Sequence, residues 1–519
     1  MARSDMAEGP TTLNMRDDRM EGWSAPPPLR CAKRSPSPSP LRGHGEVAFI
    51  PRSAAAREGS PMRRATHLTR LLMLALVLVF ASAQTAAAQS ILRDTETEKL
   101  FAEMSKPLIE AAQLDPKNVQ IVLINDPEIN AFVMQGQAVY IHSGLLTAAD
   151  NANQVQGVIA HELGHIAGGH AIRINEGAKQ ATAISILSLV LGGLAMAAGA
   201  GEAAMGVMAA GQQAALGSFL AFTRTQETSA DLAGASYLSK AGISGKGSIQ
   251  FFKKLQNQEY RLAIYATDSY NRTHPLSSER IASLQEVYEK DPAWNTPTDP
   301  KIEAAFQRVR AKLIGYISEP NLVLRNYPVS DTSVPAHYAR AYAYHRQGFR
   351  DKAVAEADAL LRISPDDPYF LELKGQVLLE SGKPADAIPP LREAVQRSGN
   401  APMISAMLGH ALIATERPEN FPEAERVLKA SVSRDNDNPF AWYQLGVVYD
   451  RKGDLARAAL ASAERYSLSG EPKLALTSAE MALRGIPAGT PDHIRAQDIA
   501  MVSRTAVERD KKRRDREPR

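Results

Sequence analysis

Two histidines and a glutamate in the stretch His161-Glu-Leu-Gly-His165 have the types and spacing of a metal-dependent catalytic site. An α-helix has about 3.6 residues per turn, so side chains at i and i+4 project from one face and two imidazoles can bind one metal ion. Glu162 follows the first histidine directly, where a carboxylate could take a proton from water as a general base. Apolar residues recur here at helical intervals, which predicts a helix over residues 153–171 with Asp150 as its N-cap.

This five-residue pattern alone does not establish a metal site, because His-Glu-x-x-His also arises as a surface cluster on unrelated helices. A catalytic zinc site needs a third protein ligand and an open position. His170 is one candidate, but it lies nine residues after His161 instead of the ten that the metzincin spacing requires, and Ala171 occupies the tenth position. We therefore interpret His170 as a residue at the end of the helix.

A carboxylate pair further along the chain supplies a better third ligand. Glu227 and Asp231 are one turn apart on a predicted helix that also carries apolar Leu232, Ala235 and Leu238. Glu227 could complete the metal site, and Asp231 could accept a hydrogen bond from the far nitrogen of a ligand histidine. The competing interpretation is an ordinary charged helix face exposed to solvent.

A third cluster, at residues 273–280, adds a histidine and an arginine after the two predicted metal helices. His274 and Arg280 bring donor or cationic groups that could stabilise the oxyanion formed when water attacks a peptide bond.

Taken in order, the motifs His-Glu-x-x-His, Glu-x-x-Ala-Asp and His-Pro-x-x-x-x-Arg resemble the gluzincin family that includes the HtpX-type heat-shock proteases and the CAAX prenyl proteases. The resemblance covers roughly residues 101–288. It implies one zinc ion per chain, with His161, His165 and Glu227 as ligands. It further implies Glu162 as the general base and Asp231, His274 and Arg280 as supporting catalytic residues.

Two roles remain open for His274. It could donate to the reaction intermediate during turnover, or it could close the open position of the zinc and hold the enzyme inactive until a substrate displaces it.

Two segments before the metal helix, residues 125–132 and 138–146, also resemble this family. The second reads as a β-strand. By analogy it would be the edge strand against which an extended substrate lies, with the peptide recognised by strand addition.

The N-terminal part of the chain contains no predicted domain core. Residues 1–61 are rich in Pro, Ser and Arg and lack hydrophobic periodicity, so we expect them to be disordered or to precede the true start of translation. Residues 62–88 have the pattern of a signal peptide, with two arginines, an apolar run and small residues at the cleavage site. We expect translation from Met62, cleavage after Ala88 and export to the periplasm.

The mature chain would contain no cysteine, because Cys31 lies in the part that processing removes. It could then form no disulfide and use no cysteine as a metal ligand. Residues 1–88 also carry 12 of the 60 basic and 7 of the 57 acidic residues, which leaves a net charge near −2. This charge gives no support for nucleic-acid binding.

Residues 181–222 carry no charged side chain except Glu202, and their length would allow a hairpin of two membrane-spanning helices. The membrane-bound relatives of HtpX type favour that interpretation. Alanine and glycine dominate the segment, however, and gain little on entering lipid; only residues 184–194 are strongly apolar. We therefore favour helices that pack near the active-site cleft or make peripheral contact with a membrane surface.

Residues 291–300 are rich in Pro, Thr and Asp and predict a linker, after which a helical repeat begins. Gly348 and Gly382 are 34 residues apart, which is the period of tetratricopeptide helical hairpins. The clearest copy reads Trp442-x-x-Leu-Gly-x-x-Tyr449.

We expect about four repeat units over residues 334–484, within a repeat domain at 301–500, followed by a charged, disordered tail at 501–519. The concave face of such an array commonly binds extended segments or partner proteins.

Together these patterns predict an α+β, mainly helical protein: a zinc metallopeptidase domain at residues 89–290 followed by an α-solenoid of tetratricopeptide-like repeats. The layout is similar to that of peptidases of periplasmic quality control. That similarity implies unfolded or stalled outer-membrane proteins as substrates and their assembly machinery as a partner of the repeats. The rival interpretations are a non-catalytic chaperone that uses only the repeats, and a membrane-embedded protease of the HtpX type.

Overall fold

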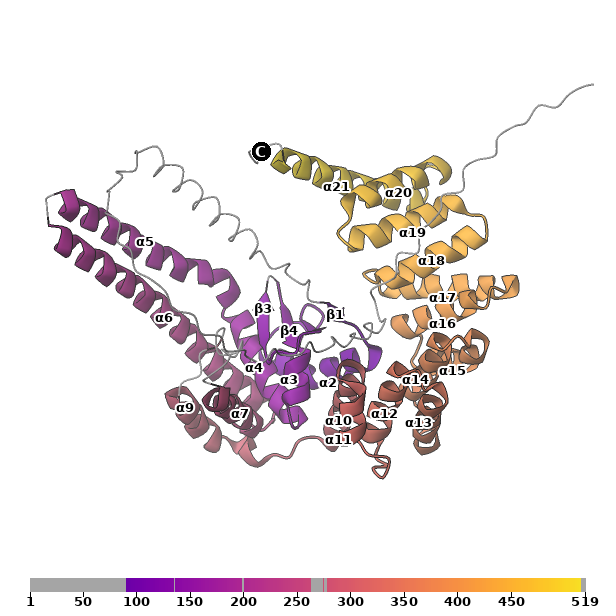
Figure 1. Cartoon of the computed structure of the whole chain (residues 1–519), viewed down its shortest axis with the longest axis horizontal. Coiled ribbons are helices and arrows are strands. Elements are labelled where there is room, and N and C mark those ends of the chain that lie inside the picture. Colours follow the sequence, from indigo (N-terminus) through magenta and orange to yellow (C-terminus); the bar gives the residue numbers. More distant parts are fainter. Residues whose placement is uncertain (1–89, 135, 198–199, 263–273, 275–277, 515–519) are drawn as a thin grey trace, which may run out of the picture. The chain divides into compact units, whose positions relative to one another are not determined.

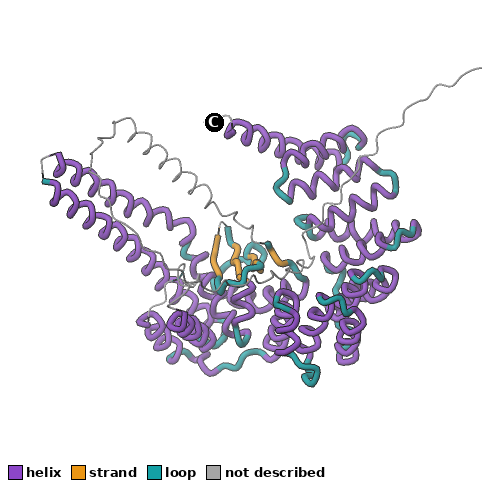
Figure 2. Tube along the Cα trace, viewed as in Figure 1, coloured by secondary structure: helices purple, strands orange, loops and turns teal. Residues whose placement is uncertain are grey.

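The computed structural model describes residues 90–134, 136–197, 200–262, 274 and 278–514. The N-terminal extension and signal peptide expected at residues 1–61 and 62–88 therefore lie outside the described residues. Most described elements are helices, and the strands belong to one small sheet (Figures 1 and 2).

The sheet has four short strands in the order β1-β2-β4-β3: β1 (Ile91–Leu92), β2 (Gln120–Ile124), β4 (Ala138–His142) and β3 (Ala131–Met134). Strand β4 pairs in parallel with β2 on one side and antiparallel with β3 on the other. The prediction that the strand at residues 138–146 is an edge strand is therefore wrong. It is an inner strand, and its hairpin partner β3 forms the edge.

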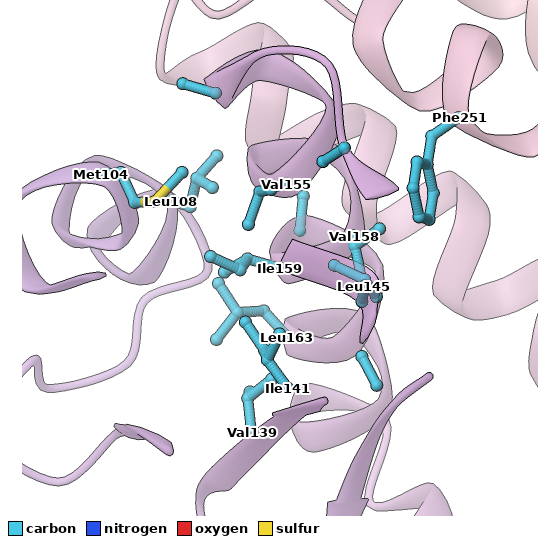
Figure 3. Packing of buried hydrophobic residues seen from close by; sticks show 14 of the residues in the cluster. Met104, Leu108, Val139, Ile141, Leu145, Val155, Val158, Ile159, Leu163 and Phe251 are labelled. Carbon is cyan, nitrogen blue, oxygen red and sulfur yellow. The ribbon is translucent and has the colours of Figure 1, made fainter. Parts of the chain in front are cut away.

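Helix α4 (Ala152–Ala167) lies at the centre of the first hydrophobic core, and every one of its residues from Ala152 to His165 is buried. Figure 3 shows α4 side chains packing with residues of α2 (Thr95–Ala111), of β4, of α3 (Ser143–Ala148) and of α7 (Lys246–Leu262). Helix α4 is therefore an internal helix, surrounded by other elements of the domain.

Two details of the predicted metal helix are corrected. Its N-cap is Asn151, whose Oδ1 accepts a hydrogen bond from Gln154 N at 3.0 Å, and not Asp150. The helix also does not continue to residue 171. It ends at Ala167, and a turn with Gly169 at φ +61° separates it from the next helix.

Helices α5 (His170–Ala197) and α6 (Gly201–Lys240) run side by side as a long antiparallel hairpin, which we call the arm (Figure 1). The prediction that residues 181–222 pack near the active-site cleft is not met, since most of this segment is exposed. By length and composition, α5 could cross a membrane. The inner part of α6 returns to the first core through Ala235 and Leu238.

Residues 291–300 are ordered against the peptidase domain and do not form a free linker. They contain the 3-10 helix η1 (Pro292–Asn295), and Trp294 O accepts a hydrogen bond from Ser244 Oγ at 2.6 Å. Helix α10 (Pro300–Ile317) then places Phe306 and Val309 in the same core as α2 and α4. The predicted domain boundary at residue 301 therefore does not separate two hydrophobic cores.

The remaining helices form successive antiparallel pairs, as the 34-residue period predicts. After α11 (Pro320–Asn326) the pairs are α12 (Val334–Arg346) with α13 (Arg350–Ile363), α14 (Pro368–Glu380) with α15 (Pro384–Arg397), α16 (Pro402–Ala414) with α17 (Phe421–Arg434), α18 (Pro439–Arg451) with α19 (Leu455–Leu468), and α20 (Pro472–Gly485) with α21 (Pro491–Arg514). Gly348 and Gly382 occupy turns with φ of +79° and +76°, a conformation that glycine adopts without strain.

Helix α21 corrects the expectation of a disordered tail at residues 501–519, because it is helical through Arg514. Ala496 and Ala500 are buried against residues of α19 and α20. Packing of this short apolar face holds a segment whose overall composition is highly charged.

Candidate metal centre

The metal-site residues come from α4, from α6, and from the segment that leads into α9 (Ser278–Glu289). Helices α4 and α6 cross closely because glycine lies at the contact. A Cβ built on Gly164 would lie only 2.6 Å from the carbonyl oxygen of Ala230. This close crossing brings the inner face of α6, with Glu227 and Asp231, against the histidines of α4.

Four side chains converge at the centre: His161, His165, Glu227 and His274 each offer a ligand atom, and these atoms all lie within 4.8 Å of one another. The Nε2 atoms of His161 and His165 are 3.1 Å apart. Glu227 Oε2 lies 3.4 Å from the first of them and Glu227 Oε1 lies 3.3 Å from the second. All four are nearly or fully buried from solvent.

This donor set fits a divalent metal. Two imidazole nitrogens that face each other at 3.1 Å beside a carboxylate offer lone pairs toward one point. Nitrogen and carboxylate donors in this number are those that Zn²⁺ and similar ions prefer. The sequence-predicted ligands His161, His165 and Glu227 are thus brought together in the form a metal requires.

The second nitrogen of His161 is held by Asp231, whose Oδ1 lies 2.9 Å from Nδ1. Arg280 in turn donates two hydrogen bonds to the carboxylate of Asp231, at 2.6 and 2.9 Å, and lies 3.2 Å from Glu227 Oε2. A chain from arginine to aspartate to histidine fixes the orientation of the first ligand ring. With its guanidinium engaged by these two acids, Arg280 acts here as a support for them.

Electrostatics in the centre follow from burial and close pairing. Burial alone would lower the pKa of His161, but hydrogen bonds and charge from Asp231 and Glu227 outweigh it and raise the pKa to about 10. Burial would raise the pKa of Glu227, yet the three neighbouring histidines hold it far below its usual range. Burial lowers the pKa of His165. The cluster therefore keeps the Glu227 carboxylate ionised and ready to face a cation.

Glu162 is completely buried, with 0 % of its surface exposed. Neither of its carboxylate oxygens has a hydrogen-bond partner within the described part of the chain. The imidazole of His274 approaches it, with Nε2 3.5 Å from Oε1. A buried carboxylate without hydrogen bonds is costly, and such groups are typical of catalytic positions.

His170 is a residue that the sequence interpretation placed outside the site. Its Nδ1 lies 2.9 Å from His165 Nδ1, and its side chain is buried. Burial, together with the neighbouring His165, lowers the pKa of His170 to about 4. The signal that pointed to it was the pair Gly168-Gly169 directly before it, which interrupts the predicted helix.

The edge strand β3 borders the site. Because His142 N donates to Asn130 O, and because hydrogen-bonded pairs alternate in antiparallel strands, the backbone groups of Ala131 and Val133 point away from β4. The carbonyl oxygen of Ala131 is 3.3 Å from Nε2 of His274. His274 therefore contacts both the cluster of candidate ligands and the outer edge of β3, where Ala131 is buried.

Comparison with known proteins agrees with this geometry. Residues 92–288 match the model of peptidase family M48, and residues 338–402 and 410–471 match that of the tetratricopeptide repeat. The chain is 25% identical to the beta-barrel assembly-enhancing protease of Escherichia coli K12 over 361 residues, which are 67% of this chain and 71% of that protein. The metalloprotease LoiP of the same organism is 28% identical over 201 residues, 38% of this chain and 73% of its own length.

Among solved structures, the tetratricopeptide protein YrrB, described as having an unusual peptide-binding site, is similar with a TM-score of 0.28 and 22% identity. It covers 35% of this chain and 94% of its own. The chain is a metallopeptidase with an M48 peptidase domain followed by tetratricopeptide repeats, and it is homologous to the beta-barrel assembly-enhancing proteases.

Proposed function

We propose that the protein is a zinc-dependent endopeptidase of the bacterial envelope that cleaves unfolded or stalled outer-membrane proteins. The observation that carries the peptidase activity is the buried cluster of His161, His165 and Glu227 beside Glu162, a carboxylate with no hydrogen-bond partner among the described residues. The homology to assembly-enhancing proteases supports the substrate class and the location.

His161, His165 and Glu227 would hold the zinc. The ion would supply a Lewis acid that polarises the peptide carbonyl and makes water a stronger nucleophile. Glu162 would accept the proton of that water and pass it to the leaving amine. Its complete burial favours proton transfer, because no bulk water competes for its oxygens.

Asp231 and Arg280 would act on the ligands and not on the substrate. Asp231 faces Nδ1 of His161 and so leaves Nε2 free for the metal. Arg280 contacts both buried acids, Asp231 and Glu227, and its single positive charge offsets part of their negative charge. Their roles are thus to orient and to balance charge.

The outer edge of β3 would be a suitable place for an extended substrate once His274, which contacts the carbonyl of the buried Ala131, is displaced. The outward backbone groups of Ala131 and Val133 could pair with a peptide added as a further strand. This binding mode reads main-chain groups and depends little on side-chain sequence, which suits a peptidase that acts on unfolded chains.

The position of His274 supports the second of its two roles, that of a displaceable inhibitor. Its Nδ1 lies 3.1 Å from Glu227 Oε1 and 3.3 Å from His161 Nε2, inside the ligand cluster. Its Nε2 contacts the carbonyl of Ala131, which a bound peptide would need. A substrate strand at β3 would therefore compete with His274, and its arrival would free the site.

The repeat pairs from α12 to α21 would bind substrates or the assembly machinery for outer-membrane proteins. The repeats and the relatives' name support this, and an extended partner could lie on the array of helical pairs.

The arm would make peripheral contact with an anionic membrane surface. Large apolar residues of α5 are exposed, among them Leu187 at 59% and Leu191 at 48%. Basic Lys179 near the inner end suits acidic lipid headgroups. Polar and exposed Gln213, about a third of the way along α6, argues against insertion of both helices through the bilayer.

The test compares the exported chain with its Glu162→Gln variant, which keeps the size of the side chain and removes the base. We expect both proteins to bind about one zinc per chain by metal analysis. We expect the variant to lose at least ~100-fold in the rate of casein cleavage.

Absence of zinc in the wild-type protein, or casein cleavage that survives in Glu162→Gln, would contradict the proposal. His274→Ala separates the two roles of that histidine in the same assay. Faster cleavage, including cleavage of the protein itself, supports the inhibitory role, whereas slower cleavage supports donation to the intermediate.

A further inference from the structure

His170 makes a contact in the metal centre for which the peptidase motifs give no role. Its Nδ1 atom is 2.9 Å from Nδ1 of His165, and the two ring centroids are 4.9 Å apart at an angle of 79°. Only 6% of the His170 surface is exposed. The contact is thus short, directional and shielded from water.

The backbone is arranged to leave room for this ring. Gly169 turns the chain with φ +61° directly after α4, a conformation that few side chains tolerate. A Cβ on Gly168 would collide with the His170 imidazole. The two glycines therefore let α5 begin at His170 with its ring directed back onto His165.

The protons can be assigned from the chemistry of the donors. Nε2 of His165 faces His161 and Glu227, so it must be unprotonated to bind a cation there. A neutral imidazole then carries its hydrogen on Nδ1. That hydrogen points at Nδ1 of His170, which must be the acceptor, with the hydrogen of His170 on its own Nε2.

We propose that His170 is a positioning residue that accepts the Nδ1–H of His165 and thereby fixes the tautomer and the ring orientation of this ligand. This role rests on the proposed metallopeptidase function. It parallels the role of Asp231 toward His161, but it uses a neutral acceptor instead of a carboxylate. The centre therefore gains a hydrogen bond at His165 without a further negative charge.

The proposal also ties the arm to the metal centre at both of its inner ends. His170 is the first residue of α5, and α6 carries Glu227. Each helix of the arm thus holds one side of the ligand cluster.

The test measures zinc affinity by competition with a chromophoric chelator in the full exported chain. His170→Phe keeps a ring but offers no acceptor, and we expect it to bind zinc 10- to 100-fold more weakly than the wild type, as a rough range for lost ligand support. His170→Asn places an oxygen near the position of Nδ1, and we expect it to restore most of the affinity. His170→Gln places its oxygen near Nε2 and should not.

A matched control is His410→Phe in α16, where a histidine packs edge-on against Phe440 far from the metal motifs in sequence. It should bind zinc as the wild type does. Equal affinity in His170→Phe and wild type would overturn the proposal, and so would equal weakness of the Asn and Gln variants, since a packing role predicts no difference between them. If His170→Phe does not fold by circular dichroism, the comparison of Asn with Gln decides alone. Failure of the wild type to bind zinc would instead refute the proposed function.

Discussion

Glu372 of α14 should make the protein less stable as the pH rises from 5 to 9. The side chain is 7% exposed, and its Oε2 has no hydrogen-bond partner among the described residues. Burial raises its pKa to about 8; Lys312 of α10 opposes this shift, whereas Asp94 and Glu96 at the start of α2 add to it. Tyr342 and Tyr369 also face the group.

The sign follows from proton binding. Between pH 4.5 and about 8 the folded state keeps a proton on Glu372 that the unfolded state has released, so stability falls with rising pH in this window and levels off above it. One pKa unit corresponds to about 1.4 kcal/mol. From pH 6 to pH 9 the free energy of unfolding should therefore fall by about 2.5 kcal/mol from this group.

Glu372→Gln removes this ionisation and keeps the shape of the side chain. Urea denaturation of the wild type and of the variant at pH 6 and pH 9, followed by circular dichroism, gives the difference. Between pH 6 and pH 9, the free energy of unfolding of the variant should rise by about 2.5 kcal/mol relative to that of the wild type. The exposed Glu393→Gln, which breaks only a surface pair with Arg397, should show no such change. Parallel pH profiles for wild type and Glu372→Gln would refute the reasoning.

Two further predictions concern the metal centre and the arm. Asp231→Asn leaves His161 without its anionic partner, so zinc affinity measured by chelator competition should fall 10- to 100-fold, roughly 1.4–2.8 kcal/mol; an unchanged affinity would remove Asp231 from the ligand support. In the arm, we expect the double variant Leu187→Gln and Leu191→Gln to stay in the supernatant when phosphatidylglycerol vesicles are pelleted. The wild type should pellet with the vesicles. So should a Leu455→Gln control, which changes an exposed leucine of α19. Wild-type protein that stays in the supernatant, or that resists alkaline extraction from membranes, would contradict peripheral contact.

The features of the fold that follow from local periodicity could be predicted from the sequence. The spacing of His161 and His165, and of Glu227 and Asp231, is enough to place each pair on one helix face. The 34-residue period likewise predicts the helical repeats, because each hairpin repeats the same turn and small positions. These features depend on residues that are close together in the chain, so they can be predicted from the sequence alone.

The features that could not be predicted depend on contacts between segments that lie far apart in the sequence. Residues 138–142 have the same alternation whether they form an inner or an edge strand, so the place of β4 between β2 and β3 is decided by pairing with distant segments. The helix predicted around His165 also continues past Gly168 and Gly169 to residue 171, because a glycine pair alone does not say in which direction the chain turns. Only the backbone turn there directs His170 back to the site.

The two helices of the arm contact each other along their length, so we expect them to move together. Glycines of each helix face side chains of the other along the seam between α5 and α6: a Cβ on Gly211 would overlap Ser188, and one on Gly192 would overlap Met208, so the helices approach closely. A contact made by the exposed leucines of α5 would then act on α5 and α6 together; His170 is the first residue of α5, and Glu227 lies within α6. Because those two residues hold His165 from opposite nitrogens, such a contact should change the direction of the His165 ring before it breaks the cluster.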